Sequence, residues 1–227
     1  MVKIKVPGTS ANIGPGFDTL GLALNIFNEI TVEKKNSGIE VLWDIPNPNI
    51  PLEDNLVYVA LVHTLKKYKK EDLGCTVRMT KVDIPISRGL GSSAAAIVCG
   101  IYAAHYLMDY SLSTKDIVNI ATELEGHPDN VAPAIFGGMT VSLNYKDEIK
   151  TISFMPKLNL KMIVAVPEFC CLCDIALFTS RNHCFKDCFF IFIFFRYSKF
   201  PLPNMLDILI NPAVNFHQTL AGYPVTA

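Results

Sequence analysis

One segment constrains this chain more than any other: residues 85–95, with the sequence PISRGLGSSAA. It follows an alternating apolar and polar run at 75–82 and precedes an alanine-rich run that reaches Leu107. We therefore expect a strand, a glycine-rich turn and then a helix. Glycine lets the N–H groups of such a turn approach a ligand closely, and the first turn of a helix attracts an anion. The segment predicts a phosphate-binding loop.

The loop differs from a Walker A motif because the Gly-Lys-Ser/Thr ending is absent. The alternative reading is a glycine-rich turn, capped by serine, before an ordinary helix. The candidate phosphate-binding residues are Pro85, Ile86, Ser87, Arg88, Gly89, Leu90, Gly91, Ser92, Ser93, Ala94 and Ala95.

A second polar cluster, EGHPDN, occupies residues 125–130. It brings two carboxylates, an imidazole and an amide together just after the expected end of a helix at Gly126. Glu125 could be presented to Mg²⁺, with His127 and Asn130 facing a polar substrate. The alternative is a solvated turn that caps a following helix. Pro128 biases His127 away from helical geometry under either reading.

The third cluster is TSANIGPGFD at residues 9–18, which follows an expected strand at 2–6 that Pro7 and Gly8 end. Asn12 and Asp18 could bind the ammonium and hydroxyl groups of a small substrate. The alternative is a tight inter-strand loop in which these side chains form Asx turns.

Composition excludes several classes of protein. Half of the 227 residues are apolar and 18% are charged, which excludes a disordered chain. The formal net charge is -1, so no basic field favours nucleic acid or an anionic membrane. The N-terminus lacks a long apolar run, and the longest such run, at 188–195, is too short to cross a bilayer. We expect a cytoplasmic protein that binds neither nucleic acid nor membrane.

The order of the expected elements predicts a two-layer α+β fold. Strands come first, and helices mixed with strands follow, without a regular βαβ repeat. The expected strands are 2–6, 20–24, 29–33, 39–43, 75–82, 139–143, 152–154 and 160–166, and the expected helices are 55–69, 92–107 and 113–125. In the last helix, Ser113 and Asp116 have the spacing of a capping box.

Together the three clusters resemble the GHMP kinases and, within them, the homoserine kinase family. The loop PISRGLGSSAA is similar to the family's ATP-binding motif. The segments VPGTSANIGPGFDTLG and EGHPDNVAPAIFGG resemble homoserine kinases in particular. The resemblance covers residues 1–169. It implies the two-layer GHMP-kinase N-terminal domain as the fold of that part.

The resemblance also implies a role for each matching residue. The loop 85–95 wraps the phosphates of ATP, and Asn55 lies near the nucleotide base. Ser93 and Glu125 bind Mg²⁺. The homoserine contacts are Asn12, Asp18 and His127, and Asn130 lies at the transferring phosphoryl group. Because an amide takes no proton at neutral pH, Asn130 cannot act as a base.

The implied reaction transfers the γ-phosphate of ATP to the hydroxyl of L-homoserine, a step of threonine synthesis. Two alternatives remain open: a truncated, non-catalytic nucleotide-binding module, and a GHMP kinase for mevalonate, a sugar or another alcohol. A homodimer is left open as well.

Beyond residue 169 the resemblance ends. Residues 170–227 contain five of the seven cysteines and lack the arginine segment and the glycine-rich motif that the family carries there. We expect a divergent tail, with the family's C-terminal ferredoxin-like domain missing or incomplete.

Overall fold

The long strand β2 (Leu20–Lys35) organises the main sheet because three other strands pair with it. β1 (Val2–Ala11) runs antiparallel along most of its length. β4 (Gly74–Val82) pairs with one end of β2 and β5 (Met139–Tyr145) with the other. β3 (Ile39–Trp43) extends the sheet parallel to β4, and β6 (Glu148–Phe154) extends it antiparallel to β5.

This description comes from a computed structural model, which describes residues 1–13, 16–146, 148–155, 161–163 and 207–209. Two short strands, β7 (Lys161–Ile163) and β8 (Asp207–Leu209), pair with each other in a second sheet. Apart from β8, the predicted tail at 170–227 lies outside the described residues, and so does the expectation about a ferredoxin-like domain.

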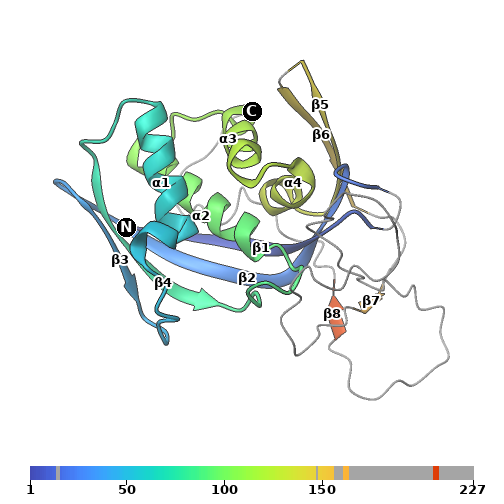
Figure 1. The fold of residues 1–227 in the computed structure, drawn as a ribbon, viewed down its shortest axis with the longest axis horizontal. Coiled ribbons are helices and arrows are strands. Elements are labelled where there is room, and N and C mark those ends of the chain that lie inside the picture. Colours follow the sequence, from blue (N-terminus) through green and yellow to red (C-terminus); the bar gives the residue numbers. More distant parts are fainter. Residues whose placement is uncertain (14–15, 147, 156–160, 164–206, 210–227) are drawn as a thin grey trace, which may run out of the picture.

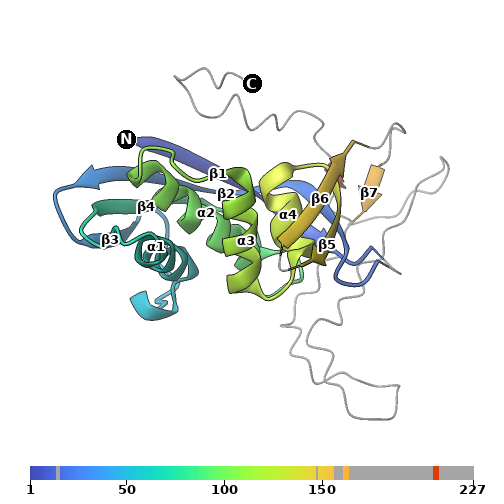
Figure 2. The ribbon, with the colours of Figure 1, turned by 90° about the horizontal axis from the view of Figure 1, so that it is seen from above.

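In the described part of the chain, four helices form the second layer, on one side of the main sheet (Figure 1 and Figure 2). They are α1 (Leu56–Lys67), α2 (Ser92–Leu107), α3 (Thr114–Glu125) and α4 (Pro128–Phe136), and a short 3-10 turn, η1 (Leu52–Asp54), precedes α1. α2 and α4 pack directly on β1 and β2. The predicted two-layer α+β architecture is confirmed.

Two glycines bring these layers close together. A Cβ atom at Gly100 in α2 would lie 2.3 Å from the carbonyl oxygen of Val57 in α1. A Cβ atom at Gly21 in β2 would lie 2.0 Å from the carbonyl oxygen of Asp129 in α4. Both positions need glycine because a neighbouring backbone occupies the space that a side chain would take. The second contact places α4, whose first three residues are the last three of the EGHPDN cluster, directly on β2.

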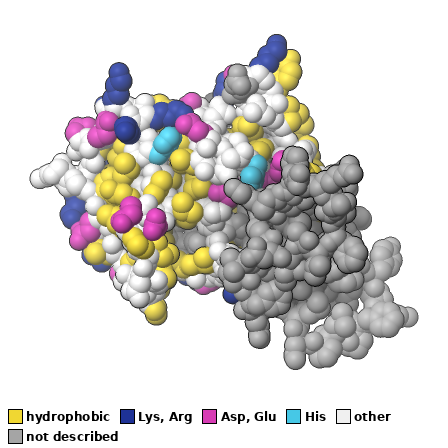
Figure 3. All heavy atoms as spheres, in the orientation of Figure 1, with side chains coloured by type: hydrophobic (Ala, Val, Ile, Leu, Met, Phe, Trp, Pro, Cys, Tyr) yellow, Lys and Arg dark blue, Asp and Glu magenta, His cyan; other side chains and the backbone are white. Residues whose placement is uncertain are grey.

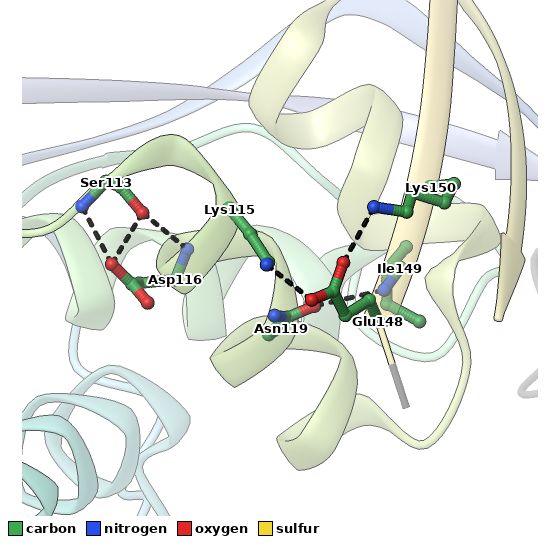
Figure 4. A network of polar contacts seen from close by, with 7 residues as sticks. All are labelled: Ser113, Lys115, Asp116, Asn119, Glu148, Ile149 and Lys150. Atoms are coloured by element: carbon green, nitrogen blue, oxygen red, sulfur yellow. Dashed lines mark hydrogen bonds and ion pairs between the residues drawn. The ribbon is translucent and has the colours of Figure 1, made fainter. Parts of the chain in front are cut away.

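Polar contacts at both ends and along its length hold α3 in place. Ser113 and Asp116 form the predicted capping box, and Gly126 ends the helix with φ of 97°. The Asn119 amide oxygen accepts a hydrogen bond from the Ile149 N–H of β6 at 3.1 Å. Glu148 of β6 also pairs with Lys115 at 2.5 Å (Figure 4). These contacts matter for the site because Glu125 is the last residue of α3.

Several strand boundaries differ from those predicted; for example, β5 ends at Tyr145 rather than 143, and β6 begins at Glu148 rather than 152. β1 does not end at Pro7 and Gly8 but continues to Ala11, with a register shift between Pro7 and Thr9. A proline is tolerated there because, among the described strands, β1 pairs only with β2 and lies at an edge of the sheet. No second described strand therefore needs the missing N–H group. The predicted strands 20–24 and 29–33 are one continuous strand, β2.

Charges of both signs are interspersed with apolar side chains over the face seen in Figure 3. Several form surface ion pairs, such as Lys34 with Asp109 at 2.5 Å and Lys35 with Glu40 at 2.7 Å. Within the described residues, no helix combines the length and the hydropathy that a membrane span requires.

Candidate functional site

The glycine-rich loop connects β4 to α2 in a conformation that suits an anion. Ser87, Gly89 and Gly91 have positive φ of 55°, 67° and 65°, whereas the residues between them do not. Such alternation turns successive backbone N–H groups toward a common concave side. Gly91 is the N-cap of α2, and Ser92 and Ser93 begin the helix. The loop therefore leads into a helix N-terminus, where N–H groups lack intrahelical acceptors.

Ser93 and Glu125 meet at this helix N-terminus. The Ser93 hydroxyl donates a hydrogen bond to Glu125 Oε1 at 2.6 Å, and both residues are partly buried. The contact joins the first turn of α2 to the last residue of α3. It brings together the two residues that the sequence predicts to bind Mg²⁺.

Thr9 of β1 joins the third cluster to the second. Its hydroxyl donates a hydrogen bond to Asn130 Oδ1 at 2.8 Å, across 121 positions of sequence. Asn130 lies in the first turn of α4. This helix packs closely on β2 at Gly21. The Asn130 side chain therefore links α4 to the edge strand β1.

His127 and Asp129 form a pair at the start of α4. His127 is the N-cap, in extended geometry with φ of -148°, and Pro128 is the first helical residue. The His127 Nδ1 atom lies 2.5 Å from Asp129 Oδ1. The Asp129 side chain is 1% exposed and that of His127 is 27% exposed. The carboxylate is thus buried beneath an imidazole that reaches the surface.

Asn12 and Asp18 also lie together, in the connection between β1 and β2. The Asn12 amide oxygen accepts a hydrogen bond from the backbone N–H of Asp18 at 2.9 Å. Both residues have positive φ, 66° and 52°. Asp18 is exposed, whereas Asn12 is partly buried. The geometry is that of a side chain bracing its own loop, and a role in binding homoserine stays a prediction.

Asn55 serves as the N-cap of α1. Its amide oxygen accepts hydrogen bonds from the N–H groups of Val57 at 3.0 Å and Tyr58 at 3.4 Å, and the residue is 6% exposed. These two capping hydrogen bonds occupy the amide oxygen. A position near a nucleotide base stays a prediction.

The three sequence clusters therefore converge on the first turn of α2. The third cluster reaches it through Thr9, and the second through Glu125 and Asn130. Two participants, Thr9 and Asp129, were given no role by the sequence. Thr9 was missed because β1 was predicted to stop before it, and Asp129 because its burial depends on how α4 packs.

The side chains that meet near the first turn of α2 offer mainly oxygen atoms as possible metal ligands. Within the described part of the chain, no group of three or more His, Cys, Asp and Glu side chains has a metal-binding arrangement. Ser93 and Glu125 offer a hydroxyl and a carboxylate, which suit a hard cation such as Mg²⁺ that also takes phosphate and water ligands. The donor set fits a cation that arrives with a nucleotide, because two protein oxygens alone make a weak site.

Comparison with known proteins identifies the domain that carries this site. The family model for the GHMP kinase N-terminal domain matches residues 55–138, which include the glycine-rich loop, the start of α2 and the EGHPDN cluster. The chain contains a GHMP kinase N-terminal domain. The resemblance drawn from the three clusters is thereby confirmed.

The relatives of this GHMP kinase domain include homoserine kinases. The homoserine kinase of Clostridium novyi is 47% identical over 169 residues, which are 74% of this chain and 56% of that protein. The homoserine kinase structure from Cytophaga hutchinsonii is 29% identical, with a TM-score of 0.63, over 74% of this chain and 56% of that one. The chain thus spans little more than half the length of the homoserine kinases it matches.

The same fold occurs in more distant kinases. The mevalonate kinase structure from Methanococcus jannaschii has a TM-score of 0.56 at 18% identity, over 72% of this chain and 60% of that one. At that identity the likeness concerns the fold of the GHMP kinase domain alone.

Proposed function

We propose that this GHMP kinase domain belongs to a homoserine kinase, which transfers the γ-phosphate of ATP to the hydroxyl of L-homoserine. The observation that carries the proposal is the convergence of the three clusters on the first turn of α2. The identity to homoserine kinases, 47% for that of Clostridium novyi, favours homoserine over other acceptors. The product is O-phospho-L-homoserine, and the step belongs to threonine synthesis in the cytoplasm.

The residues divide into a nucleotide side and an acceptor side. The backbone N–H groups of the loop 85–95 and of the α2 N-terminus bind the phosphates of ATP. Asn55 lies toward the base. On the acceptor side, Asn12, Asp18 and His127 bind homoserine. In this proposal Asn130 lies between the two sides, where its amide donates to the phosphoryl group in transfer.

Ser93 and Glu125 hold Mg²⁺ in this proposal. The bound ion supplies charge neutralisation on the phosphate oxygens, which lowers the barrier to phosphoryl transfer. Ser93 and Glu125 come from different helices, so the carboxylate is positioned by the capping box and the β6 contacts that hold α3.

The chemical step requires positioning more than covalent help. The homoserine hydroxyl oxygen forms a bond to the γ-phosphorus, while the bond from that phosphorus to the bridging oxygen of ADP breaks. The hydroxyl proton passes to a phosphate oxygen, since Asn130 cannot accept it. The Asp129 carboxylate holds the His127 imidazole beside the homoserine during the transfer.

The experiment that tests the proposal is ADP release by the full 227-residue chain with homoserine, mevalonate or galactose as the acceptor. Release that depends on homoserine alone supports the proposed function. Release with another acceptor assigns the domain to a different GHMP kinase. ATP binding without release, measured by calorimetry on the same sample, leaves a nucleotide-binding module and rejects catalysis by this chain.

A further inference from the structure

Thr9 occupies an unusual position for a polar residue. It is fully buried in β1, at 0% exposure. Its backbone N–H donates to the carbonyl oxygen of Leu90 at 3.0 Å, and its hydroxyl donates to Asn130 Oδ1 at 2.8 Å. One residue therefore bonds both to the glycine-rich loop and to the amide proposed to lie at the transferring phosphoryl group.

The loop also packs tightly on the Thr9 hydroxyl. A Cβ atom built at Gly91 would lie 1.9 Å from Thr9 Oγ1, well inside any permitted contact. Gly91 must therefore lack a side chain for Thr9 to keep its place, in addition to having φ of 65°. The backbone of Gly91, the N-cap of α2, therefore packs directly against the Thr9 hydroxyl.

The hydrogen bond from Thr9 orients the Asn130 amide. An amide has an acceptor end, Oδ1, and a donor end, Nδ2. Because Thr9 donates to Oδ1, Nδ2 is the end that can donate to an anionic phosphate oxygen. With the amide turned over, Oδ1 would meet that oxygen instead, and two acceptors repel each other. The direction of one buried hydrogen bond therefore matters for a phosphoryl group.

We propose that Thr9 is a positioning residue for phosphoryl transfer, which sets the Asn130 amide relative to the phosphate-binding loop. The inference rests on the proposed function, because it assumes that Asn130 faces a phosphoryl group. It goes further in naming the group that orients the amide. Thr9 itself acts through Asn130 and the loop.

Valine and serine separate this role from mere packing. Thr9→Val keeps the shape of the side chain and removes the hydroxyl, whereas Thr9→Ser keeps the hydroxyl and removes a methyl group. If Thr9 only fills space, valine is the milder change. If it orients Asn130, serine is the milder change. Thr64→Val is a matched control, since Thr64 is a second fully buried threonine whose hydroxyl donates to the Ala60 carbonyl within α1.

The first readout is the side-chain amide signal of Asn130 in the full chain labelled with ¹⁵N-asparagine, assigned by its loss in Asn130→Ala. We expect Thr9→Val to shift and broaden this signal, and Thr9→Ser and Thr64→Val to leave it in place. An unchanged Asn130 signal in Thr9→Val overturns the proposal. This readout needs no turnover, so it stands even if homoserine-dependent ADP release is absent.

The second readout is kinetic, in a chain that shows turnover. We expect Thr9→Val to lower kcat about tenfold, with the KM for ATP within twofold, because one hydrogen bond of about 1.4 kcal/mol corresponds to a factor of ten. Thr9→Ser recovers most of kcat. A kcat loss in serine that equals or exceeds the loss in valine contradicts the proposal and assigns Thr9 to packing alone.

Discussion

Ser93 and Glu125 lie 32 positions apart in the sequence, yet the Ser93 hydroxyl donates to Glu125 Oε1 at 2.6 Å. Ser93 lies in the first turn of α2, and Glu125 is the last residue of α3. A hydroxyl and a carboxylate at the N-terminus of a helix that follows a glycine-rich loop form the oxygen-donor pair of the proposed Mg²⁺ site.

Ser93→Ala and Glu125→Gln are predicted to raise the Mg²⁺ concentration needed for half-maximal ADP release. Ser93→Ala removes one oxygen donor and Glu125→Gln removes the negative charge of the other. A contact to a charged group contributes about 1.5–3 kcal/mol, which is tenfold or more. The measurement is a Mg²⁺ titration of turnover. Thr64→Val is the control because the Thr64 hydroxyl donates to the Ala60 carbonyl oxygen within α1 and has no proposed role in the site. Equal Mg²⁺ dependence in all four proteins argues against the site.

Asn130→Ala is predicted to lower kcat by at least tenfold while ATP affinity stays within a few-fold of wild type. The reason is that the amide is proposed to donate to the phosphoryl group in transfer, where interactions are strongest in the transition state. Stopped-time ADP assays and calorimetric ATP titration provide the two values. An equal loss of affinity and kcat would place Asn130 in ground-state binding.

The His127–Asp129 pair is predicted to behave as a coupled unit. His127→Asn leaves a buried carboxylate without its imidazole, which costs about 1–3 kcal/mol of unfolding free energy. Adding Asp129→Asn removes that buried charge and recovers part of the loss. Urea unfolding of the two single variants and the double variant gives the coupling energy. Strict additivity would show that the two side chains do not stabilise each other.

Gly21→Ala is predicted to separate α4 from β2. The added methyl group would lie 2.0 Å from the Asp129 carbonyl oxygen and 2.7 Å from Pro133 Cγ, so the helix must move. Overpacking of this kind costs about 1–3 kcal/mol or more. Gly38→Ala is the control for an added methyl group without a clash, because nothing lies within 4 Å of the added Cβ and its cost comes only from the strain of φ of 78°. Thermal unfolding should show a larger loss for Gly21→Ala than for Gly38→Ala.

The capping box of α3 is predicted to give a pH-dependent stability term. Hydrogen bonds from the Ser113 side chain, more than its backbone N–H, lower the pKa of Asp116 below its usual 3.8. A lowered pKa in the folded state stabilises the protein above pH 3.8, and that contribution disappears as the pH falls through the folded-state value. Ser113→Ala should therefore cost about 1 kcal/mol at pH 7, and the cost should shrink toward pH 3. Urea unfolding at both pH values checks this, and a cost that does not change with pH would exclude the carboxylate's part.

Cys75 and Cys99 are predicted to resist alkylation in the folded protein. Burial raises the pKa of the Cys75 thiol to about 11 and that of Cys99 to about 12. At pH 8 little thiolate is therefore present at either residue, and thiolate is the reactive form. Peptide mapping after iodoacetamide treatment should find both unmodified until urea is added. Rapid labelling of Cys99 without urea would show that α2 is less well packed than described.

Local signals were sufficient where a structural feature depends on neighbours in sequence. The capping box at Ser113, the helix end at Gly126 and the extended geometry of His127 before Pro128 all follow from short-range rules. The glycine-rich loop was also placed correctly between a strand and a helix.

Features that depend on tertiary partners were not predictable. Pro7 and Gly8 signalled the end of a strand, yet β1 continues to Ala11 because β2 lies beside it and an edge strand accepts a proline. α4 was not among the expected helices, since a helix after the 125–130 cluster entered only as the alternative to a binding role, although Pro128 suits a first helical position. The role of Thr9 was not predictable either, because Thr9 lies in the extension of β1 and its hydrogen-bond partner, Asn130, lies in α4.

The most direct test of the central claim is ³¹P NMR of the full chain incubated with ATP, Mg²⁺ and L-homoserine. The account predicts a phosphomonoester signal that matches O-phospho-L-homoserine and grows as the γ-phosphate signal declines. It predicts at least tenfold slower growth of this signal with Asn130→Ala and, at a Mg²⁺ concentration that limits the variant, with Glu125→Gln. A phosphomonoester that forms equally well in both variants would contradict the claim that the first turn of α2 is where phosphoryl transfer takes place.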